Sequence, residues 1–351
     1  MRMKQFKLSY IYLLAVLLVA GSCKKQEEEI PRGEFATGVF VVNEGNFGDA
    51  DGTISFFDPT VKTSTQDIYA KANGSSISGT FQSVYFYGTN AFIIDQAGHK
   101  IEVVEAETFK HIATIDQGLD VPRYMTVANG KGYVSNWGPY DANWNTPNSF
   151  IAVIDLTNFS VIKTINTENG VEGMATVNET VYAAASGSTI VHIIDSQLDE
   201  ITGVIQTPSA PRLLAEDATG KLWVLCNDYV TSNLARLDLI NETMETSFTI
   251  EGGAKSLAIN GTGDKVYYLC TPWGALASVN VVDITAAIAP STPLVSGDSF
   301  YGLGVDPSDE TIYIGKSNGA DNGTIIRFNS SGAELDNFPS GRFPNGFEFR
   351  K

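Results

Sequence analysis

The sequence predicts an all-β protein in which one unit of four short strands is repeated seven times. Short apolar segments recur at intervals of 40 to 49 residues, and each is followed by turn residues and further strands. The first repeat lacks its opening segment, and the last residues of the chain supply a matching one. Repeats of this length made only of short strands are typical of a β-propeller, in which each repeat is one blade around a central channel.

The first strand expected in each repeat contains the apolar residue that marks the period. These residues are Val84, Met125, Met174, Leu214, Leu257, Leu303 and Phe347. A turn rich in Gly, Asn and Asp follows, because these residues accept a positive φ or hydrogen-bond to the nearby backbone. The second strand is aromatic and β-branched, as in "KLWVLC" and "KVYYLC", which suits a pleated surface packed on both sides.

The third strand of the repeat is the clearest. It recurs seven times, as in "FIAVIDLT" and "SVNVVDIT", and usually ends on Asp or Asn, which can cap a tight turn. A weaker fourth strand ends near Gly, as in "TIDQG". Each repeat therefore supplies one four-stranded antiparallel blade.

The two ends of the chain predict how the ring closes. The first repeat begins directly with its second strand, whereas "FPNGFEFRK" at 343–351 matches the first-strand pattern of "VPRYMTV". We therefore expect the C-terminal strand to join the first blade and complete a seven-bladed propeller over residues 38–351. A closed ring removes exposed sheet edges, which allows a chain of this length to form one domain.

An export segment precedes the predicted propeller. Three cations are followed by the 13-residue apolar run "LSYIYLLAVLLVA", which is shorter than the ~20 residues that a membrane span needs. The sequence "GSC" that follows resembles a bacterial lipobox, so we expect residues 1–22 to be a lipoprotein signal peptide and Cys23 to carry the lipid. An ordinary secretory signal with an incidental cysteine is the alternative. We expect residues 23–37 to form a flexible acidic tether.

Composition excludes one class of partner. The net charge is −17, and removal of residues 1–22 deletes three cations and no acid. Proteins that bind nucleic acid need a basic face to displace counterions from phosphates, and the chain has no basic run that could form one. We therefore expect no nucleic-acid partner, and contact with a membrane only through the lipid anchor.

The sequence offers little for catalysis. The three histidines, His99, His111 and His192, fall at unrelated points of different repeats, and no nucleophile or metalloprotease motif is present. We predict no catalytic residue, no resident metal and no cofactor. A calcium-dependent hydrolase of the lactonase type remains open, because "DADG" at 49–52 and "GADNG" at 319–323 contain oxygen ligands. Both sequences are also ordinary turns.

Two cysteines, Cys226 and Cys270, end the second strands of consecutive repeats. Matching positions in adjacent blades usually lie farther apart than the roughly 4.4–6.8 Å between Cα atoms that a disulfide permits. We expect two buried thiols rather than a disulfide.

One set of residues is expected to surround the mouth of the channel, because each lies two positions before a period-marking apolar residue. The set is Gln82, Arg123, Glu172, Arg212, Lys255, Tyr301 and Asn345. With three cations and one anion this ring is net positive on an acidic protein. The alternative interpretation is that polar side chains simply line a channel filled with water.

Aromatic residues gather in the loops between second and third strands, which converge on the same face. The third repeat is lengthened by "NWGPYDANWNTPNS" at 136–149. Exposed aromatic side chains mark recognition surfaces, so we predict a binding site that includes these loops. Its aromatic residues are Phe47, Trp137, Tyr140, Trp144, Tyr229 and Trp273. The alternative is an insertion that folds down and plugs the channel.

The chain resembles the YncE-like surface propellers, and within them the BtuG-type corrinoid-binding lipoproteins of Bacteroidota-type uptake systems. The resemblance rests on "VFVVNEGNFG…GTISFFDP" at 39–59, on third strands such as "VIDLTN", and on the lipobox. It implies a lipoprotein on the cell surface, anchored in the outer membrane, that captures a large micronutrient and passes it to a TonB-dependent transporter.

Several ligands and functions stay open at this point. A corrinoid such as cobalamin is broad and rich in amides and carries one phosphate, which suits aromatic walls and a few cations, and the mixed ring with Glu172 slightly favours it. A ferric siderophore or haem is the alternative within the binding class, and strongly anionic siderophores would select the cations Arg123, Arg212 and Lys255. A protein-interaction scaffold and the calcium-dependent hydrolase are alternatives from other classes.

Overall fold

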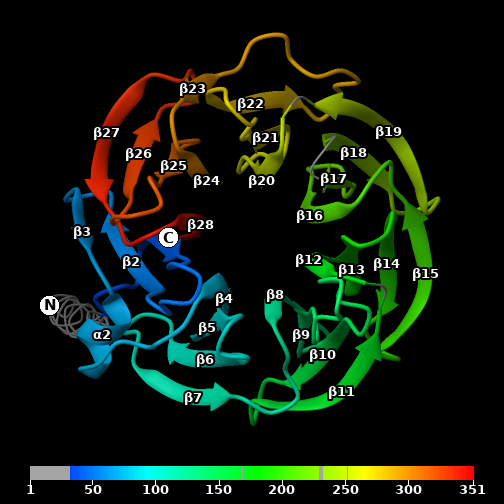
Figure 1. The fold of residues 1–351 in the computed structure, drawn as a ribbon, viewed down its shortest axis with the longest axis horizontal. Helices are drawn as coiled ribbons and strands as arrows, with labels where there is room; N and C mark the ends of the chain where they lie inside the picture. The colour runs from blue at the N-terminus through cyan, green and yellow to red at the C-terminus, as the bar shows by residue number, and fades with distance from the viewer. Residues whose placement is uncertain (1–31, 168, 229–231, 251) are drawn as a thin grey trace, which may run out of the picture. The chain divides into compact units, whose positions relative to one another are not determined.

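The computed structural model describes residues 32–167, 169–228, 232–250 and 252–351. Seven antiparallel sheets of four strands are arranged in a ring, as Figure 1 shows. The prediction of an all-β, seven-bladed β-propeller is confirmed. The proposed signal peptide and the lipid-bearing Cys23 lie outside the described residues.

Each blade runs from the centre of the ring to its periphery (Figure 1). The innermost strands are β28 (Pro344–Arg350), β4 (Phe81–Tyr87), β8 (Pro122–Ala128), β12 (Val171–Val177), β16 (Pro211–Glu216), β20 (Ala254–Ile259) and β24 (Phe300–Val305). The second strands are β1 (Gly38–Asn43), β5 (Asn90–Asp95), β9 (Lys131–Asn136), β13 (Thr180–Ala185), β17 (Leu222–Asn227), β21 (Lys265–Cys270) and β25 (Ile312–Lys316).

The outermost strand of each blade is more exposed than the third strand. The third strands are β2 (Thr53–Asp58), β6 (Lys100–Glu105), β10 (Phe150–Asp155), β14 (Ile190–Asp195), β18 (Ser232–Asp238), β22 (Ala277–Asp283) and β26 (Thr324–Phe328). The outermost strands are β3 (Thr63–Thr65), β7 (His111–Ile115), β11 (Ser160–Asn166), β15 (Glu200–Gln206), β19 (Thr243–Ile250), β23 (Val295–Gly297) and β27 (Glu334–Pro339). Alternating exposed side chains on the outermost strands explain why their sequence signal is weak.

The ring is closed by the C-terminal strand, as predicted. β28 pairs antiparallel with β1, with Val41 opposite Phe347 and Val39 opposite Phe349. Both phenylalanine rings pack against Tyr313 of the last blade, at centroid distances of 5.9 and 5.4 Å. The closing strand therefore joins the first blade through its backbone and contacts the last blade through its side chains.

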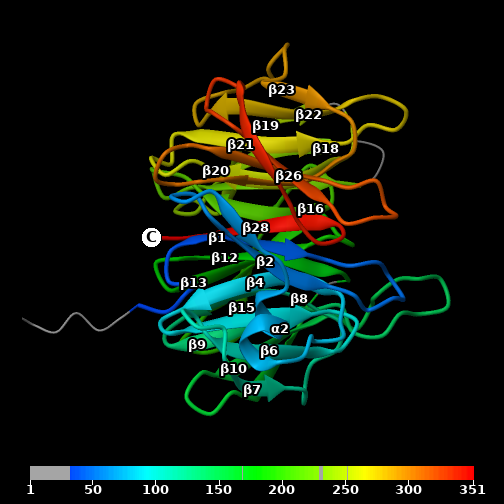
Figure 2. The same cartoon turned by 90° about the vertical axis from the view of Figure 1, so that its left-hand side faces the viewer.

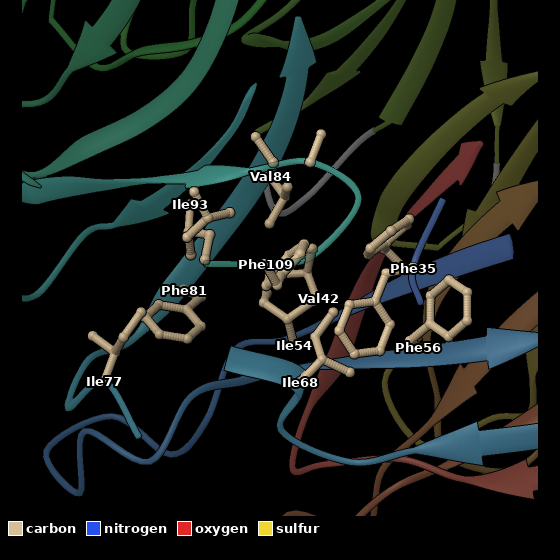
Figure 3. Close-up of a cluster of buried hydrophobic side chains, with 14 residues drawn as sticks. Phe35, Val42, Ile54, Phe56, Ile68, Ile77, Phe81, Val84, Ile93 and Phe109 are labelled. Carbon is tan, nitrogen blue, oxygen red and sulfur yellow. The ribbon is translucent and has the colours of Figure 1, made fainter. Parts of the chain in front are cut away.

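Apolar side chains fill the space between neighbouring blades. Figure 3 shows the cluster between the first two blades, where Phe56, Ile54 and Phe81 meet Ile93 and Phe109. Ile54, Phe56, Phe81 and Ile93 lie on strands of two different repeats, so each blade covers the apolar face of the next. Phe109 lies in the turn between β6 and β7. The core is consequently distributed around the ring.

A short helix, α2 (Ile68–Asn73), lies between β3 and β4 and was not predicted. Its N-cap Asp67 accepts a hydrogen bond from the backbone N–H of Ala70 at 3.0 Å. Asn73 donates to the carbonyl of Phe109 at 2.9 Å and accepts from the backbone N–H of His111 at 2.9 Å. The helix thus attaches the first blade to the outer strand of the second.

The Asp residues that end the third strands cap the following turns. Asp58, Asp155 and Asp238 each accept a hydrogen bond from the backbone N–H two residues later, at 2.8, 2.8 and 3.0 Å. The side chain of Thr157 also donates to Asp155, and these bonds hold the pKa of that carboxyl below its usual value. The recurring Asp therefore fixes the turn into the outer strand.

Cys226 and Cys270 are both buried, and no disulfide joins them, as expected. Burial raises the pKa of the Cys226 thiol to about 12, which keeps it protonated and unreactive. Within the described ranges, no helix has both the length and the hydropathy that crossing a membrane requires.

Candidate ligand-binding site at the channel mouth

A cavity of about 790 Å³ opens at one end of the channel. Its wall includes all seven residues that the repeat predicts at the mouth: Gln82, Arg123, Glu172, Arg212, Lys255, Tyr301 and Asn345. Each is the second residue of an innermost strand, and these strands surround the centre of the ring in Figure 1. The repeat therefore places the seven side chains together, although they come from seven different blades.

Below this ring the cavity wall is mainly apolar. It contains six of the seven residues that mark the repeat, namely Val84, Met125, Met174, Leu257, Leu303 and Phe347. A polar mouth over an apolar interior is the usual composition of a site for a small molecule.

Two arginines at the mouth share one carboxylate. Nε of Arg123 lies 3.1 Å from Glu172, and Nη1 of Arg212 lies 3.5 Å from the same side chain. Arg123 and Glu172 are both buried, and Arg123 also donates to Gln96. Glu172, the one anion of the predicted ring, is therefore shared by two of its three cations.

Replacing Glu172 with Gln is expected to lower the free energy of unfolding by about 1.5 kcal/mol, because the buried guanidinium of Arg123 and the partly buried one of Arg212 lose a charged acceptor. Urea denaturation measures the change. Glu200→Gln is the matched control, because Glu200 is exposed and lies 3.8 Å from Lys163. Equal stability of the two variants would contradict the structural role given to Glu172.

The third cation of the ring has a different environment. Nζ of Lys255 lies 2.8 Å from the centroid of the Tyr301 ring, and the Tyr301 hydroxyl donates to Glu44 at 2.6 Å. Desolvation by the surrounding protein lowers the pKa of Lys255 to about 8, although the side chain reaches into the cavity. Glu44, in the connection between β1 and β2, was not predicted, and it brings a second carboxylate to the mouth.

Neutral polar groups complete the mouth. Gln82 donates to the hydroxyl of Tyr124 at 2.8 Å, and burial raises the pKa of Tyr124 to about 12. Oδ1 of Asn345 and Nε1 of Trp137 are buried, and neither atom has a hydrogen-bond partner among the described residues. Buried polar atoms are normally paired, so two unpaired ones beside a cavity are suited to a ligand.

The predicted aromatic insertion lies beside the mouth. It connects β9 and β10, and Cζ of Arg123 lies 3.9 Å from the centroid of the Trp137 ring. Tyr140 contacts Trp137 and Trp144 edge to face, at centroid distances of 6.1 and 5.8 Å. The three rings line a second cavity of about 140 Å³, and Arg212 lines both cavities.

The insertion does not plug the channel with its aromatic tip. Trp144 is 80% exposed and lines only the smaller cavity. Figure 2 shows the connections after β1 and β9 on the same side of the ring, away from the C-terminus. The aromatic side chains of the insertion therefore stand on the face where the mouth opens.

The other predicted aromatic residues have different positions. Trp273, between β21 and β22, is fully exposed and lines the main cavity. Phe47 is 86% exposed and lines neither cavity, so the structure does not bring it together with the other predicted residues. Its loop is held by Arg342, which pairs with Asp49 and Asp51 at 3.0 and 2.8 Å and leaves the tip in solvent. Tyr229 lies outside the described residues.

The two turns considered for calcium have their carboxylates engaged within the protein. Asp51 also accepts the backbone N–H of Asn46 at 2.6 Å, so the first turn is occupied by protein donors and by Arg342. In the second, Asp321 accepts from the side chain of Asn318 at 3.0 Å. No cluster of three His, Cys, Asp or Glu within the described ranges is arranged to hold a metal ion.

Comparison with solved structures shows propellers of varied function. A quinonprotein alcohol dehydrogenase-like protein from Bacteroides thetaiotaomicron has a TM-score of 0.67 and 15% identity, over 90% of this chain and 78% of that one. A periplasmic gluconolactonase from Pseudomonas aeruginosa has a TM-score of 0.68 and 13% identity, over 90% and 99% of the two chains. Hydrazine synthase from Kuenenia stuttgartiensis has a TM-score of 0.57 and 19% identity, over 72% and 79%.

At such low identity these similarities establish the fold and leave the function open. No curated protein matches the chain. One family does: the domain of unknown function DUF5074 matches residues 37–347, from just before β1 into β28. The chain therefore belongs to the DUF5074 family.

Proposed function

We propose that this protein is a lipid-anchored receptor on the cell surface that captures a large micronutrient, a corrinoid such as cobalamin being favoured. It then passes the ligand to a TonB-dependent transporter of the outer membrane. The observation that supports this most strongly is the composition of the mouth, where aromatic rings, amides and internally paired charges surround one large cavity.

The charges at the mouth favour a corrinoid over a strongly anionic ferric siderophore. Arg123 and Arg212 are paired with Glu172, and Glu44 adds a second negative charge. A polyanionic ligand would have to displace Glu172 from the buried Arg123 and the partly buried Arg212, at a cost in desolvation. A corrinoid is neutral over most of its periphery, and its single phosphate needs only one accessible cation, for which Lys255 is placed.

The position of the N-terminal strand supports tethered capture. The chain enters the propeller at Gly38, where β1 starts, whereas Glu44 lies just after the end of β1 and lines the cavity. Phe35 is buried, and its backbone N–H donates to the carbonyl of Glu107 at 2.8 Å, which fixes the approach to β1. The chain therefore enters β1 at the end of the strand opposite to Glu44.

Quenching of tryptophan fluorescence tests the proposal. We expect cyanocobalamin to quench the protein with a dissociation constant in the micromolar range or below, because Trp137, Trp144 and Trp273 surround the cavities. A ferric catecholate is expected to bind at least tenfold more weakly. Free tryptophan at equal absorbance corrects for absorption of light by each ligand. Tighter binding of the catecholate would assign the protein to siderophore capture, and failure of both to bind would reject the proposal.

A further inference from the structure

One carboxyl group in the cavity has no counterpart in the other blades. Glu348 directly follows the apolar residue that marks the repeat in β28. The matching residues elsewhere are Tyr85, Thr126, Ala175, Ala215, Ala258 and Gly304. Of these seven positions, only Tyr85 and Glu348 line the cavity. Glu348 is thus a single carboxyl at a level of the channel where the other blades have small or neutral side chains.

Glu348 lies well inside the cavity. It is three residues beyond Asn345 in β28, which corresponds to about 10 Å at the rise of a β-strand. The apolar side chains of Val84, Met125 and Phe347 line the same cavity at this level of the repeat. A ligand group that enters at the mouth therefore passes Asn345 before it reaches Glu348.

The part of the chain that the structure describes supplies no partner for this carboxyl. Among the described residues, Glu348 has no hydrogen bond or ion pair through its side chain, in contrast to Glu172 and Glu44 at the mouth. Arg350, the nearest cation on the same strand, donates to the carbonyl of Ala106 at 2.8 Å and lies 5.2 Å from the ring of Phe86. The arginine is therefore directed to the second blade and does not neutralise Glu348.

The elements packed against β28 contribute few other titratable groups. They are Tyr85 and Tyr87 of β4, Tyr301 of β24, and Tyr313 and Lys316 of β25, whereas β1 has none. The hydroxyl of Tyr301 donates to Glu44, and that of Tyr313 accepts from Arg327 at 3.2 Å. Desolvation by the surrounding protein, without a compensating charge, raises the pKa of Glu348 to about 8, although the residue is only partly buried at the cavity wall. At neutral pH the side chain is therefore a carboxylic acid, with one hydrogen-bond donor and one acceptor.

We propose that Glu348 forms an inner subsite that recognises a primary carboxamide group of the bound molecule. A primary amide offers an N–H donor and a carbonyl acceptor on one edge, which match the acceptor and donor of a neutral carboxyl in two parallel hydrogen bonds. The pair is uncharged, so it suits an apolar cavity. This subsite deepens the proposed function, on which it rests, because the periphery of a corrinoid bears primary amides.

Affinity measurements at two pH values test the subsite with cyanocobalamin as the probe. Wild type is expected to bind at least fivefold more weakly at pH 9.0 than at pH 6.5, because Glu348 loses its donor as the pH rises through about 8. Glu348→Gln retains a donor and an acceptor without the titration, so it is expected to bind like wild type at pH 6.5 and more tightly than wild type at pH 9.0. Glu348→Ala is expected to bind about tenfold more weakly at pH 6.5.

The comparison with Glu348→Gln also separates the effect of titrating Glu348 on binding from the effect of titrating Lys255, whose pKa lies in the same range. Lys255 titrates equally in wild type and variant, so only the difference between the two profiles reports on Glu348. Identical profiles, or unchanged binding by Glu348→Ala, would overturn the subsite while leaving corrinoid capture intact. Weaker binding by Glu348→Gln than by wild type at both pH values would point to a cationic ligand group instead and would also overturn it.

A fragment probe keeps the test independent of the corrinoid. Benzamide is expected to give saturation-transfer NMR signals at pH 6.5 with wild type and Glu348→Gln, and to lose them with Glu348→Ala, whereas benzoate gives none. Benzamide binding at Glu348 without cobalamin binding would support the subsite and reject corrinoid capture. Absence of benzamide binding to wild type would overturn the subsite. Circular dichroism confirms that each variant is folded.

Discussion

Removal of residues 343–351 is expected to abolish the cooperative folding of the propeller. The deletion removes β28, which supplies the whole innermost strand of the first blade and pairs with β1 from Gly38 to Asn43. It also removes Phe347 and Phe349, which pack against Tyr313 of the last blade. The lost backbone pairing and apolar burial are worth more than about 5 kcal/mol, which is comparable with the whole stability of a domain.

Thermal unfolding followed by circular dichroism measures this effect. Lys351→Ala is the control, because it keeps β28 and removes only the ion pair with Asp306, 2.8 Å long. We expect the control to melt cooperatively within a few degrees of wild type and the truncated chain to show no cooperative transition. A truncated chain that melts like wild type would show that the ring does not depend on its closing strand.

The paired substitution Trp137→Ala with Trp144→Ala is expected to weaken ligand binding by at least ~2 kcal/mol, or about 30-fold, while the propeller stays folded. Trp137 contacts Arg123 at the mouth, and Trp144 presents an exposed ring beside it. Loss of both rings removes the largest flat surface of the site. Neither side chain fills a space between blades, so little stability is lost.

Isothermal titration calorimetry with cyanocobalamin measures this effect without relying on tryptophan fluorescence. Phe47→Ala is the control, because Phe47 is an exposed aromatic residue that lines neither cavity. The control is expected to bind like wild type. An unchanged dissociation constant in the double variant would remove the insertion from the binding site.

Most of the architecture can be predicted from the sequence, because the features that determine it are local along the chain. Strand periodicity, turn residues and the Asp that caps the turn after each third strand recur within every repeat. The missing first strand and the matching C-terminal segment together predict the closure that β28 and β1 form. The sequence did not predict helix α2, because a segment of six residues is too short to show a helical periodicity. The helix is stabilised by contacts with the second blade.

The repeat also predicts which side chains meet at the mouth, since Gln82, Arg123 and Lys255 occupy the same position of their strands. It does not predict how they pair. The contact of Glu172 with both arginines and that of Glu44 with Tyr301 join different blades, so no spacing along the chain reveals them.

The sequence by itself determined the number of blades, the order of their strands and the residues that face the channel, because those follow from short-range patterns repeated around a ring. Only the tertiary structure decided the electrostatics of the site. It paired Glu172 with two arginines at the mouth, joined the Phe47 loop to Arg342, and left Glu348 without a partner among the residues that the structure describes. The physical reason is that charge pairing and desolvation depend on distances between blades, which are far apart along the chain.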